Sequence, residues 1–433
     1  IERELEFDSF YKNMSEETKT MYRDKIIKDS KEEMTDEYSY THHLMIEALK
    51  KKKHIGFYLF YNKNYKPRRI FYVTFLLLFT TIVSYVLGTF LFKSSVVGFL
   101  LLFFLVSEIA VKCFQKFVGY FQKPSILPKM NYIEGLPSSC KTMMTIPTIV
   151  KSKEKMEKMF QKLEEFYLVN NTDHLYFTLL CDGSEECKKE MDFDKEICEY
   201  GKSLCASLNK KYKKNIFFFV YRNRFYNTSM HSYLGYERKR GALTDLNRLL
   251  LKKYSKEQIK KYFRYENLSS FKEKIKYVIT LDTDTDLVLN TALNLVGAMN
   301  HPLNHPVYNK EKTKIIEGYA LIQPRISMDI ESTNKSIYSQ TFAGVGGFSV
   351  YNSTVSDFYQ DYFHEGNFVG KGIYDLEVFD HILGNLFPEN LILSHDLLEG
   401  LFLRCGKATD IEFIDDFPSS YQVDTTRQER WAR

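Results

Sequence analysis

The stretch "KYVITLDTDTDLVLN", residues 276–290, follows an apolar run with three aspartates at alternate positions: Asp282, Asp284 and Asp286. Carboxylates at this density repel one another unless positive charge lies between them, so the pattern indicates a divalent-cation site. An EF-hand calcium loop that began at Asp282 would carry glycine at its sixth position and glutamate at its twelfth. Leu287 and Leu293 occupy those positions, which excludes the calcium loop.

A metal site at the end of a β-strand is the interpretation that remains. Because side chains alternate along a strand, Asp282 and Asp284 are expected to project to one side. Two carboxylates can hold one Mg²⁺ or Mn²⁺, whose other positions take phosphate oxygens. The alternative is a solvated turn after the strand, where aspartate is common.

Strand and helix patterns alternate along this part of the chain. Residues 174–182 ("HLYFTLLCD") and 215–222 ("NIFFFVYR") look like buried strands, and residues 152–168 have the apolar spacing of a helix. The alternation predicts an α/β domain with a mainly parallel sheet. Ligands bind beyond the carboxyl ends of the strands in such sheets. Asp182 ends one strand and Asp282 follows another, so both are expected at that edge.

Two long apolar runs precede this domain. Residues 70–92 contain no charged side chain and exceed the roughly 20 residues that a bilayer core requires. Residues 94–109 form a weaker second span that carries Glu108. With an amphipathic helix after it, we predict a transmembrane hairpin and interfacial helix over residues 66–123; the alternative is a pair of buried core helices. Basic residues flank both ends, which places both ends in the cytoplasm by the positive-inside rule.

The composition limits the remaining classes. The 433 residues are 44% hydrophobic and 27% charged, enough for at least one large core. A net charge of +5, without basic runs interleaved with aromatics, argues against nucleic-acid binding. The seven cysteines form no CxxC pair, which is typical of reduced thiols in the cytosol. Residues 1–62 are predicted to form a cytoplasmic helical region whose lysines face either water or lipid headgroups.

Three downstream stretches carry chemistry without an evident core role. Residues 363–375 ("FHEGNFVGKGIYD") combine three glycines with Lys371 and fit either a substrate loop or an ordinary surface loop. Residues 393–400 ("LSHDLLEG") set Asp396 where it is either a general base or a helix N-cap. Residues 427–431 ("RQERW") hold arginines that suit phosphate and an indole that suits a sugar face, or they end an amphipathic helix.

The order of motifs resembles the family-2-like glycosyltransferases of the cellulose and chitin synthase type, which have a GT-A fold. These motifs are a strand-end aspartate, a D-x-D, an H-D and an R-W pair, and they follow a membrane hairpin. Four longer stretches are similar to the glycosyltransferase domain of cyclic β-1,2-glucan synthases, glycosyltransferase family 84: "GYERKRGALTDLNRLL" (235–250), "GYALIQPRI" (318–326), "SDFYQDYFHEGNFVGKGIYDLEVFD" (356–380) and "FPENLILSHDLLEG" (387–400). The resemblance covers most of residues 135–433, the expected GT-A domain. Arg427 replaces the glutamine of the cellulose-type Q-x-x-R-W, which favours the β-1,2-glucan family.

The resemblance implies a membrane-bound, inverting transferase that moves glucose from UDP-glucose onto a growing β-1,2-glucan. Asp282 and Asp284 would hold Mg²⁺ or Mn²⁺ on the diphosphate, Asp182 would contact uracil or ribose, and Asp396 would be the general base. The other substrate-binding residues that it implies are Lys239, Arg240, Gln323, Arg325, Gly370, Lys371, His395, Arg427, Arg430 and Trp431. For this activity the four acids must meet at one cleft.

The resemblance also implies a multi-pass protein of the inner (cytoplasmic) membrane, in contact with lipid, with its catalytic domain in the cytoplasm. Similar synthases continue beyond residues 430–433 ("RWAR"), so further C-terminal transmembrane helices and a phosphorylase-like domain are expected in the full-length protein. Two alternatives stay open: a synthase of another β-linked polysaccharide, and a non-catalytic, membrane-tethered sugar-nucleotide-binding protein. A metal-dependent phosphohydrolase is disfavoured because His301 and His305 lie in a turn-rich loop.

Overall fold

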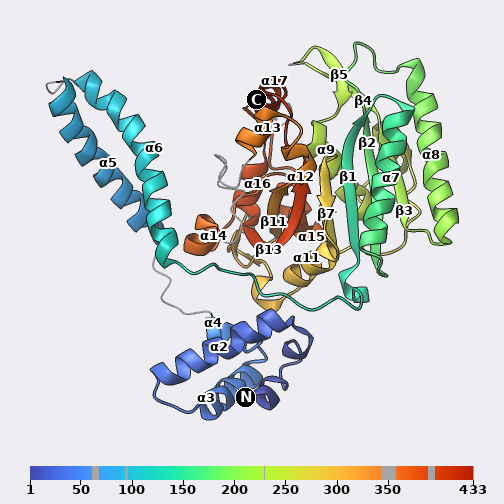
Figure 1. The fold of residues 1–433 in the computed structure, drawn as a ribbon. Helices are drawn as coiled ribbons and strands as arrows, with labels where there is room; N and C mark the ends of the chain where they lie inside the picture. The colour runs from blue at the N-terminus through green and yellow to red at the C-terminus, as the bar shows by residue number, and fades with distance from the viewer. Residues whose placement is uncertain (61–67, 93–95, 229, 344–356, 389–394, 433) are drawn as a thin grey trace.

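The structure is a computed structural model, and it describes residues 1–60, 68–92, 96–228, 230–343, 357–388 and 395–432. Figure 1 shows a small group of helices at the N-terminus, a pair of long helices that projects away from the rest, and a larger α/β domain. The α/β domain carries every candidate site residue named above.

The N-terminal helices surround a small core of their own. They are α1 (Glu2–Leu5), η1 (Tyr11–Asn13), α2 (Glu16–Glu32), α3 (Glu37–Lys51) and α4 (Gly56–Phe60). Ser15 and Asp36 begin α2 and α3 as N-caps, since each side chain accepts a backbone hydrogen bond from the first turn. Tyr11 and Tyr22 are fully buried in this core, which also contacts Met130 at the entrance to the α/β domain.

The two projecting helices, α5 (Arg68–Phe92) and α6 (Val96–Phe121), correspond to the predicted apolar runs. Both are long and apolar enough to cross a membrane, and only 11% and 17% of their most apolar windows are buried. A pair of soluble core helices would bury most of that surface, so the core-helix alternative does not fit. The interfacial helix expected after the second span is not separate, because no proline interrupts α6 before residue 121.

The base of this hairpin packs against α14 (Phe358–Phe363), a short aromatic helix of the α/β domain. The ring of Tyr72 lies 5.4 Å from that of Phe363, and the ring of Phe114 lies 6.2 Å from that of Phe358. Arg69 also pairs with Glu365 at 2.5 Å. The hairpin therefore contacts the segment that leads directly into the predicted substrate loop.

A nine-stranded sheet forms the centre of the α/β domain, in the order β6-β3-β2-β1-β7-β12-β11-β13-β8. Neighbours among β3, β2, β1 and β7 are parallel, and so are β11 and β13, whereas β12, β6 and β8 run antiparallel to their neighbours. The predicted α/β class with a mainly parallel sheet is confirmed. The strands are β1 (Thr142–Val150), β2 (Leu175–Gly183), β3 (Phe217–Arg222), β6 (Phe263–Glu266), β7 (Tyr277–Thr280), β8 (Thr285–Leu287), β11 (Leu321–Met328), β12 (Gly372–Asp375) and β13 (Cys405–Asp415).

Helices cover both faces of the sheet, which explains why its strands are apolar on both sides. On β3, Phe217 and Phe219 face one hydrophobic cluster while Phe218 and Val220 face the other. The first cluster contains side chains of α7 (Lys153–Val169), α8 (Asp192–Tyr212) and α11 (Thr291–Met299); the second contains those of α9 (Arg238–Leu250) and α15 (Leu376–Leu383). The parallel strands consequently present their carboxyl ends along one edge between the two helical layers.

Shorter elements complete the domain around this sheet. They are the hairpin β4 (Arg224–Asn227) and β5 (Ser232–Gly235), the pair β9 (Val307–Tyr308) and β10 (Ile315–Glu317), and the helices η2 (Ser138–Cys140), α10 (Lys256–Tyr262), η3 (Pro302–Asn304), α12 (Ile330–Thr333), α13 (Ile337–Phe342), α16 (Asp396–Leu403) and α17 (Tyr421–Ala432). Of these, α16 begins at the candidate base and α17 carries the R-x-x-R-W stretch.

Candidate active site

Asp282 lies just beyond the end of β7, between two lysines. Lys239, in the first turn of α9, forms an ion pair with Asp282 Oδ1. Lys371, directly before β12, places its Nζ 3.0 Å from Asp282 Oδ2. Each oxygen of this carboxylate therefore faces one ammonium group.

The two lysines decide the charge state of Asp282. Burial alone would raise the pKa of its carboxyl, but Lys239 and Lys371 outweigh burial and hold the pKa below its usual range. Burial likewise opposes the charge on Lys371, yet Asp282 and Asp415 outweigh it and raise the Lys371 pKa above its usual range. Asp282 and Lys371 are consequently both charged at neutral pH.

Asp284 and Asp286 have different surroundings. Asp284 is half-buried, and in the described part of the chain its carboxylate makes no hydrogen bond or ion pair, although it is close enough to help raise the pKa of Lys371. Asp286 is exposed and pairs with Lys162 of α7 at 2.9 Å. The expectation that Asp282 and Asp284 share one side of a strand is wrong: β7 ends at Thr280, and both lie in the turn that leads to β8.

Gly370 joins Asp396 to this cluster. Its carbonyl oxygen accepts a hydrogen bond of 2.6 Å from Lys239 Nζ, the same atom that pairs with Asp282. A Cβ added at Gly370 would lie 2.7 Å from Asp396 Oδ2, so the Asp396 carboxylate rests directly on this glycine. The backbone there has φ +89°, a conformation that residues other than glycine rarely adopt.

Gly370→Ala is expected to lower the activity of the site about 10²-fold, because the new methyl group would push Asp396 away from the loop, and displacements of about 1 Å cost this much. The effect is measured with purified protein as the rate of the sugar transfer that the family resemblance implies. Gly119→Ala in α6 is the control, since a Cβ there meets nothing within 4 Å. Equal rates for the Gly370 variant and the wild type would show that this contact is not needed.

Asp396 is the first residue of α16 and is half-exposed. His395 occupies the N-cap position, so Asp396 is not the N-cap that the sequence offered as an alternative. Within the described residues the Asp396 carboxylate has no hydrogen-bond or ion-pair partner, which leaves its oxygens available to a ligand. A carboxylate in the first turn of a helix also interacts favourably with the helix dipole.

His395 and Glu399 lie beneath Asp396 and are both buried. His395 Nδ1 lies 2.8 Å from Glu399 Oε1, one turn along α16. Burial raises the pKa of the Glu399 carboxyl, against the opposing effect of His395. One ring nitrogen of His395 and one carboxylate oxygen each of Asp396 and Glu399 lie within 4.8 Å of one another. His395 is therefore directed at Glu399 inside the protein, whereas the sequence suggested contact with substrate.

Asp182, the strand-end acid of β2, is held by a buried arginine. Arg222 Nε donates to Asp182 Oδ1 at 2.7 Å, and Arg222 Nη1 donates to Asp245 Oδ2 at 2.9 Å. Arg222 Nη2 donates to the carbonyl of Tyr236 at 2.7 Å, and Gly235 packs on the Asp182 carboxylate. Asp182 thus also fixes the segment that leads into α9.

A strained turn connects this arginine cluster to Lys239. Glu237 and Arg238 have φ of 52° and 49°, a conformation that is uncommon for such residues and is frequent at functional sites. A Cβ at Gly241 would lie 2.0 Å from the Tyr236 carbonyl, so only glycine fits there. The turn places Lys239 against Asp282 three residues after Tyr236, whose carbonyl accepts a hydrogen bond from Arg222.

The other predicted substrate-binding residues that the structure describes interact with groups of the protein itself. Gln323, on β11, accepts a 2.6 Å hydrogen bond from the backbone of Val369, next to Gly370. Arg240 pairs with Glu237 and lies over the Phe387 ring. Arg325 pairs with Glu412 at 2.9 Å and Arg427 contacts Asp424 at 3.4 Å. The side chains of Arg430 and Trp431 lie outside the described residues.

Sequence analysis missed two acids and an arginine that shape the site: Asp415, Glu399 and Arg222. Asp415 ends β13 and Arg222 ends β3, so the strand-end rule that singled out Asp182 applies to both. Glu399 follows His395 at helical i,i+4 spacing, so the sequence carries a local signal for this pair as well.

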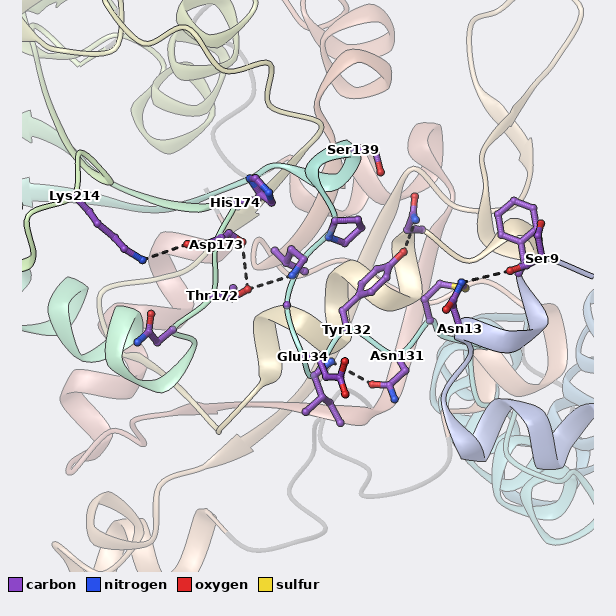
Figure 2. A pocket seen from close by; sticks show the side chains of 18 residues that line it. Ser9, Asn13, Asn131, Tyr132, Glu134, Ser139, Thr172, Asp173, His174 and Lys214 are labelled. Atoms are coloured by element: carbon purple, nitrogen blue, oxygen red, sulfur yellow. Dashed lines mark hydrogen bonds and ion pairs between the residues drawn. The ribbon is translucent and has the colours of Figure 1, made fainter. Parts of the chain in front are cut away.

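A cavity of about 900 Å³ lies away from this cluster (Figure 2). Its walls are mainly residues 130–137 and 171–174, together with Lys214 and Asn300. Those two runs precede β1 and β2, so the cavity is at the amino ends of the parallel strands. Parallel sheets bind ligands at the opposite edge, where Asp282 lies.

Comparison with known proteins identifies the relatives of this chain. No family model matches it. Over 339 residues, 77% of the chain, it is 38% identical to the cyclic beta-(1,2)-glucan synthase NdvB of Rhizobium meliloti (strain 1021). The chain is homologous to a segment of a cyclic β-(1,2)-glucan synthase. The resemblance found in the sequence is thereby confirmed, and the chain spans 12% of the length of NdvB. Among solved structures, the galactosyltransferase LgtC with donor and acceptor sugar analogues is 14% identical, covers 61% of this chain and 72% of its own, and has a TM-score of 0.24.

Proposed function

We propose that this chain is the glycosyltransferase part of a membrane-bound synthase that transfers glucose from UDP-glucose to a growing β-1,2-glucan. The observation that carries this proposal is the contact of Lys239 with both Asp282 and the Gly370 carbonyl, because it brings the candidate base Asp396 beside the candidate diphosphate site. Homology to NdvB supports the choice of sugar and product.

The acids beside the lysines fit a divalent metal ion by their chemistry. Asp282 and Asp284 offer carboxylate oxygens, the ligands that Mg²⁺ and Mn²⁺ prefer, and the Asp284 carboxylate is uncommitted among the described residues. When bound, such an ion neutralises negative charge that develops on the departing diphosphate. Lys239 and Lys371 bind the diphosphate when its oxygens compete with the Asp282 carboxylate for the N–H groups of the two lysines.

Asp396 performs the proton transfer in this scheme. Its carboxylate takes the proton of the acceptor hydroxyl while that oxygen attacks the anomeric carbon of glucose. The new C–O bond forms as the bond from glucose to UDP breaks, and UDP leaves with the bonding electron pair. One displacement inverts the configuration, from an α-linked donor to a β-linked product.

The position of Asp182 suits recognition of the nucleoside end of the donor. Arg222 fixes its carboxylate at the carboxyl edge of β2, and the turn at Tyr236 separates it from the Lys239–Asp282 pair. Uracil or ribose would therefore lie on the β2 side of the diphosphate. This arrangement follows the general rule for ligands at the carboxyl edge of α/β sheets.

A membrane location suits such a synthase. Helices α5 and α6, whose apolar surfaces are exposed, cross the inner membrane. The α/β domain lies in the cytoplasm, where UDP-glucose is made. Contacts of the hairpin base with α14 hold the catalytic domain beside the bilayer. Further C-terminal transmembrane and phosphorylase-like domains would belong to the full-length protein.

A phosphohydrolase built on the nearby histidines is not supported. His301 is fully buried, and its ring lies 5.7 Å from that of His54 and 6.3 Å from that of Tyr22, both in the N-terminal helices. Burial lowers the His301 pKa well below its usual value. This histidine packs between two parts of the protein and is not a ligand beside Asp282.

Membranes that hold the intact protein are expected to incorporate label from UDP-[¹⁴C]glucose when Mg²⁺ or Mn²⁺ is present. EDTA should abolish incorporation and added metal should restore it, because the carboxylates need the ion to hold the diphosphate. Linkage analysis of the labelled product should give β-1,2 bonds. Label in another β linkage would indicate a different polysaccharide synthase, and no label would favour a non-catalytic sugar-nucleotide-binding protein.

A further inference from the structure

Asp415, the last residue of β13, forms a closed ring of contacts with two other side chains. Its Oδ2 pairs with Lys371 Nζ, and its Oδ1 accepts a hydrogen bond of 2.8 Å from the Thr285 hydroxyl. Thr285 Oγ1 in turn accepts a hydrogen bond of 3.3 Å from Lys371 Nζ. The three residues are between 0% and 9% exposed, so water competes little with these contacts.

The sheet itself builds this ring. β8 pairs antiparallel with β13, and Asp415 lies directly opposite Thr285 in the register although the two residues are 130 positions apart. Side chains directly opposite each other on antiparallel strands lie close together on the same face. Lys371 reaches them from the loop before β12, where Gly370 and Gly372 both have positive φ.

The ring fixes the position of a lysine that would otherwise be mobile. An ammonium group has three N–H donors, and Lys371 can use all three, on Asp415, on Thr285 and on Asp282 Oδ2. Lysine has a flexible four-carbon stem, so it keeps one position only when several partners hold it. Asp415 also balances the charge, because Lys239 and Lys371 would otherwise share Asp282 alone.

We propose that Asp415, supported by Thr285, is a positioning residue that holds Lys371 beside Asp282 for the pyrophosphate group of a nucleotide donor. The inference rests on the proposed function, because it concerns the same diphosphate site. Without the Asp415 charge, Lys371 pairs with Asp282 alone. Asp282 then competes more strongly with the donor diphosphate for the Lys371 ammonium group, and donor binding weakens.

A double-mutant cycle on the intact protein, extracted in detergent, tests the inference. UDP binding in the presence of Mg²⁺ is measured by calorimetry for the wild type, Asp415→Asn, Lys371→Met and the double variant. Hydrogen bonds to charged groups have strengths that predict about a tenfold rise in Kd for Asp415→Asn. If Asp415 acts only through Lys371, the double variant binds UDP no more weakly than Lys371→Met.

Kinetics and two further variants complete the test. KM for the donor should rise in Asp415→Asn while kcat changes little, a split that a general loss of structure does not give. Thr285→Val should change Kd in the same direction by a smaller factor and serves as the second variant if Asp415→Asn does not fold. Asp410→Asn, in the same strand as Asp415 but paired with Lys129 at 2.7 Å, should leave Kd unchanged.

The outcomes separate the inference from the function on which it rests. Additive losses in the double variant, or an unchanged Kd in Asp415→Asn and Thr285→Val, would overturn the positioning role while UDP binding by the wild type left the proposed function intact. If the wild-type protein bound no UDP, the proposed function itself would fail, and the role of Asp415 with it.

Discussion

Asp396→Asn is expected to lower the rate of glucosyl transfer by about 10²- to 10⁴-fold, the usual contribution of a general base. Asparagine has nearly the same shape but cannot take the proton of the acceptor hydroxyl. UDP binding should not change, because Asp282, Lys239 and Lys371 are untouched. Radiolabel incorporation measures transfer, and calorimetry with UDP measures binding on the same preparation.

The geometry around Asp396 makes this a sharp test. In the described part of the chain its carboxylate has no ion-pair partner. Removal of its charge therefore leaves no buried charged group without a partner, and the protein should still fold. Asp410→Asn is the matched control: Asp410 is a carboxylate of the same domain that pairs with Lys129 at 2.7 Å, away from the cluster. If Asp396→Asn transferred glucose at the rate of the wild type, Asp396 would not be the general base.

Arg222→Met is expected to destabilise the α/β domain by about 3–5 kcal/mol, the usual cost of breaking a buried ion pair by removing one partner. Methionine fills much of the volume but leaves the Asp182 and Asp245 carboxylates buried without their cation. The Tyr236 carbonyl also loses its donor. The thermal midpoint of detergent-extracted protein, followed by circular dichroism, should fall by on the order of 10 °C.

The difference in stability between the wild type and Arg222→Met should become smaller as the pH falls from 7 to 5. Burial already raises the pKa of Asp182 and Asp245 against the effect of Arg222, and the variant removes that opposing effect. An acid with a higher pKa in the folded state binds protons more readily when folded, so falling pH stabilises the folded form. Lys153→Met is the control, because its pair with Glu196 is exposed to water and contributes little to stability. An unchanged midpoint at pH 7 would contradict the structural role of Arg222.

Local patterns were sufficient to find several parts of the site. An acid directly after an apolar strand is a local signal, and parallel strands share one edge of the sheet, so the sequence predicts Asp182 and Asp282 as site residues. Asp396 was identified as a candidate because it opens an apolar helical run. Each of these inferences needs only the few residues around the position.

Other features could not be found in this way. Asp282 and Asp284 lie in a turn, because the chain must leave β7 and cross the sheet to reach β13, and no local periodicity records that crossing. His395 turns inward to Glu399, which depends on what covers α16. Arg325 and Arg427 carry the right charge for phosphate, but Glu412 and Asp424 already contact them.

The sequence by itself determined the class of the fold, the apolar helical pair and the acids at the ends of strands, because each depends on spacing between near neighbours in the chain. Only the tertiary structure decided which charges meet. Lys239 faces Asp282, Lys371 is shared between Asp282 and Asp415, and Arg222 lies between Asp182 and Asp245. Electrostatic interaction depends on distance in space and on burial, and the arrangement of the nine-stranded sheet sets both for residues that are far apart in the chain.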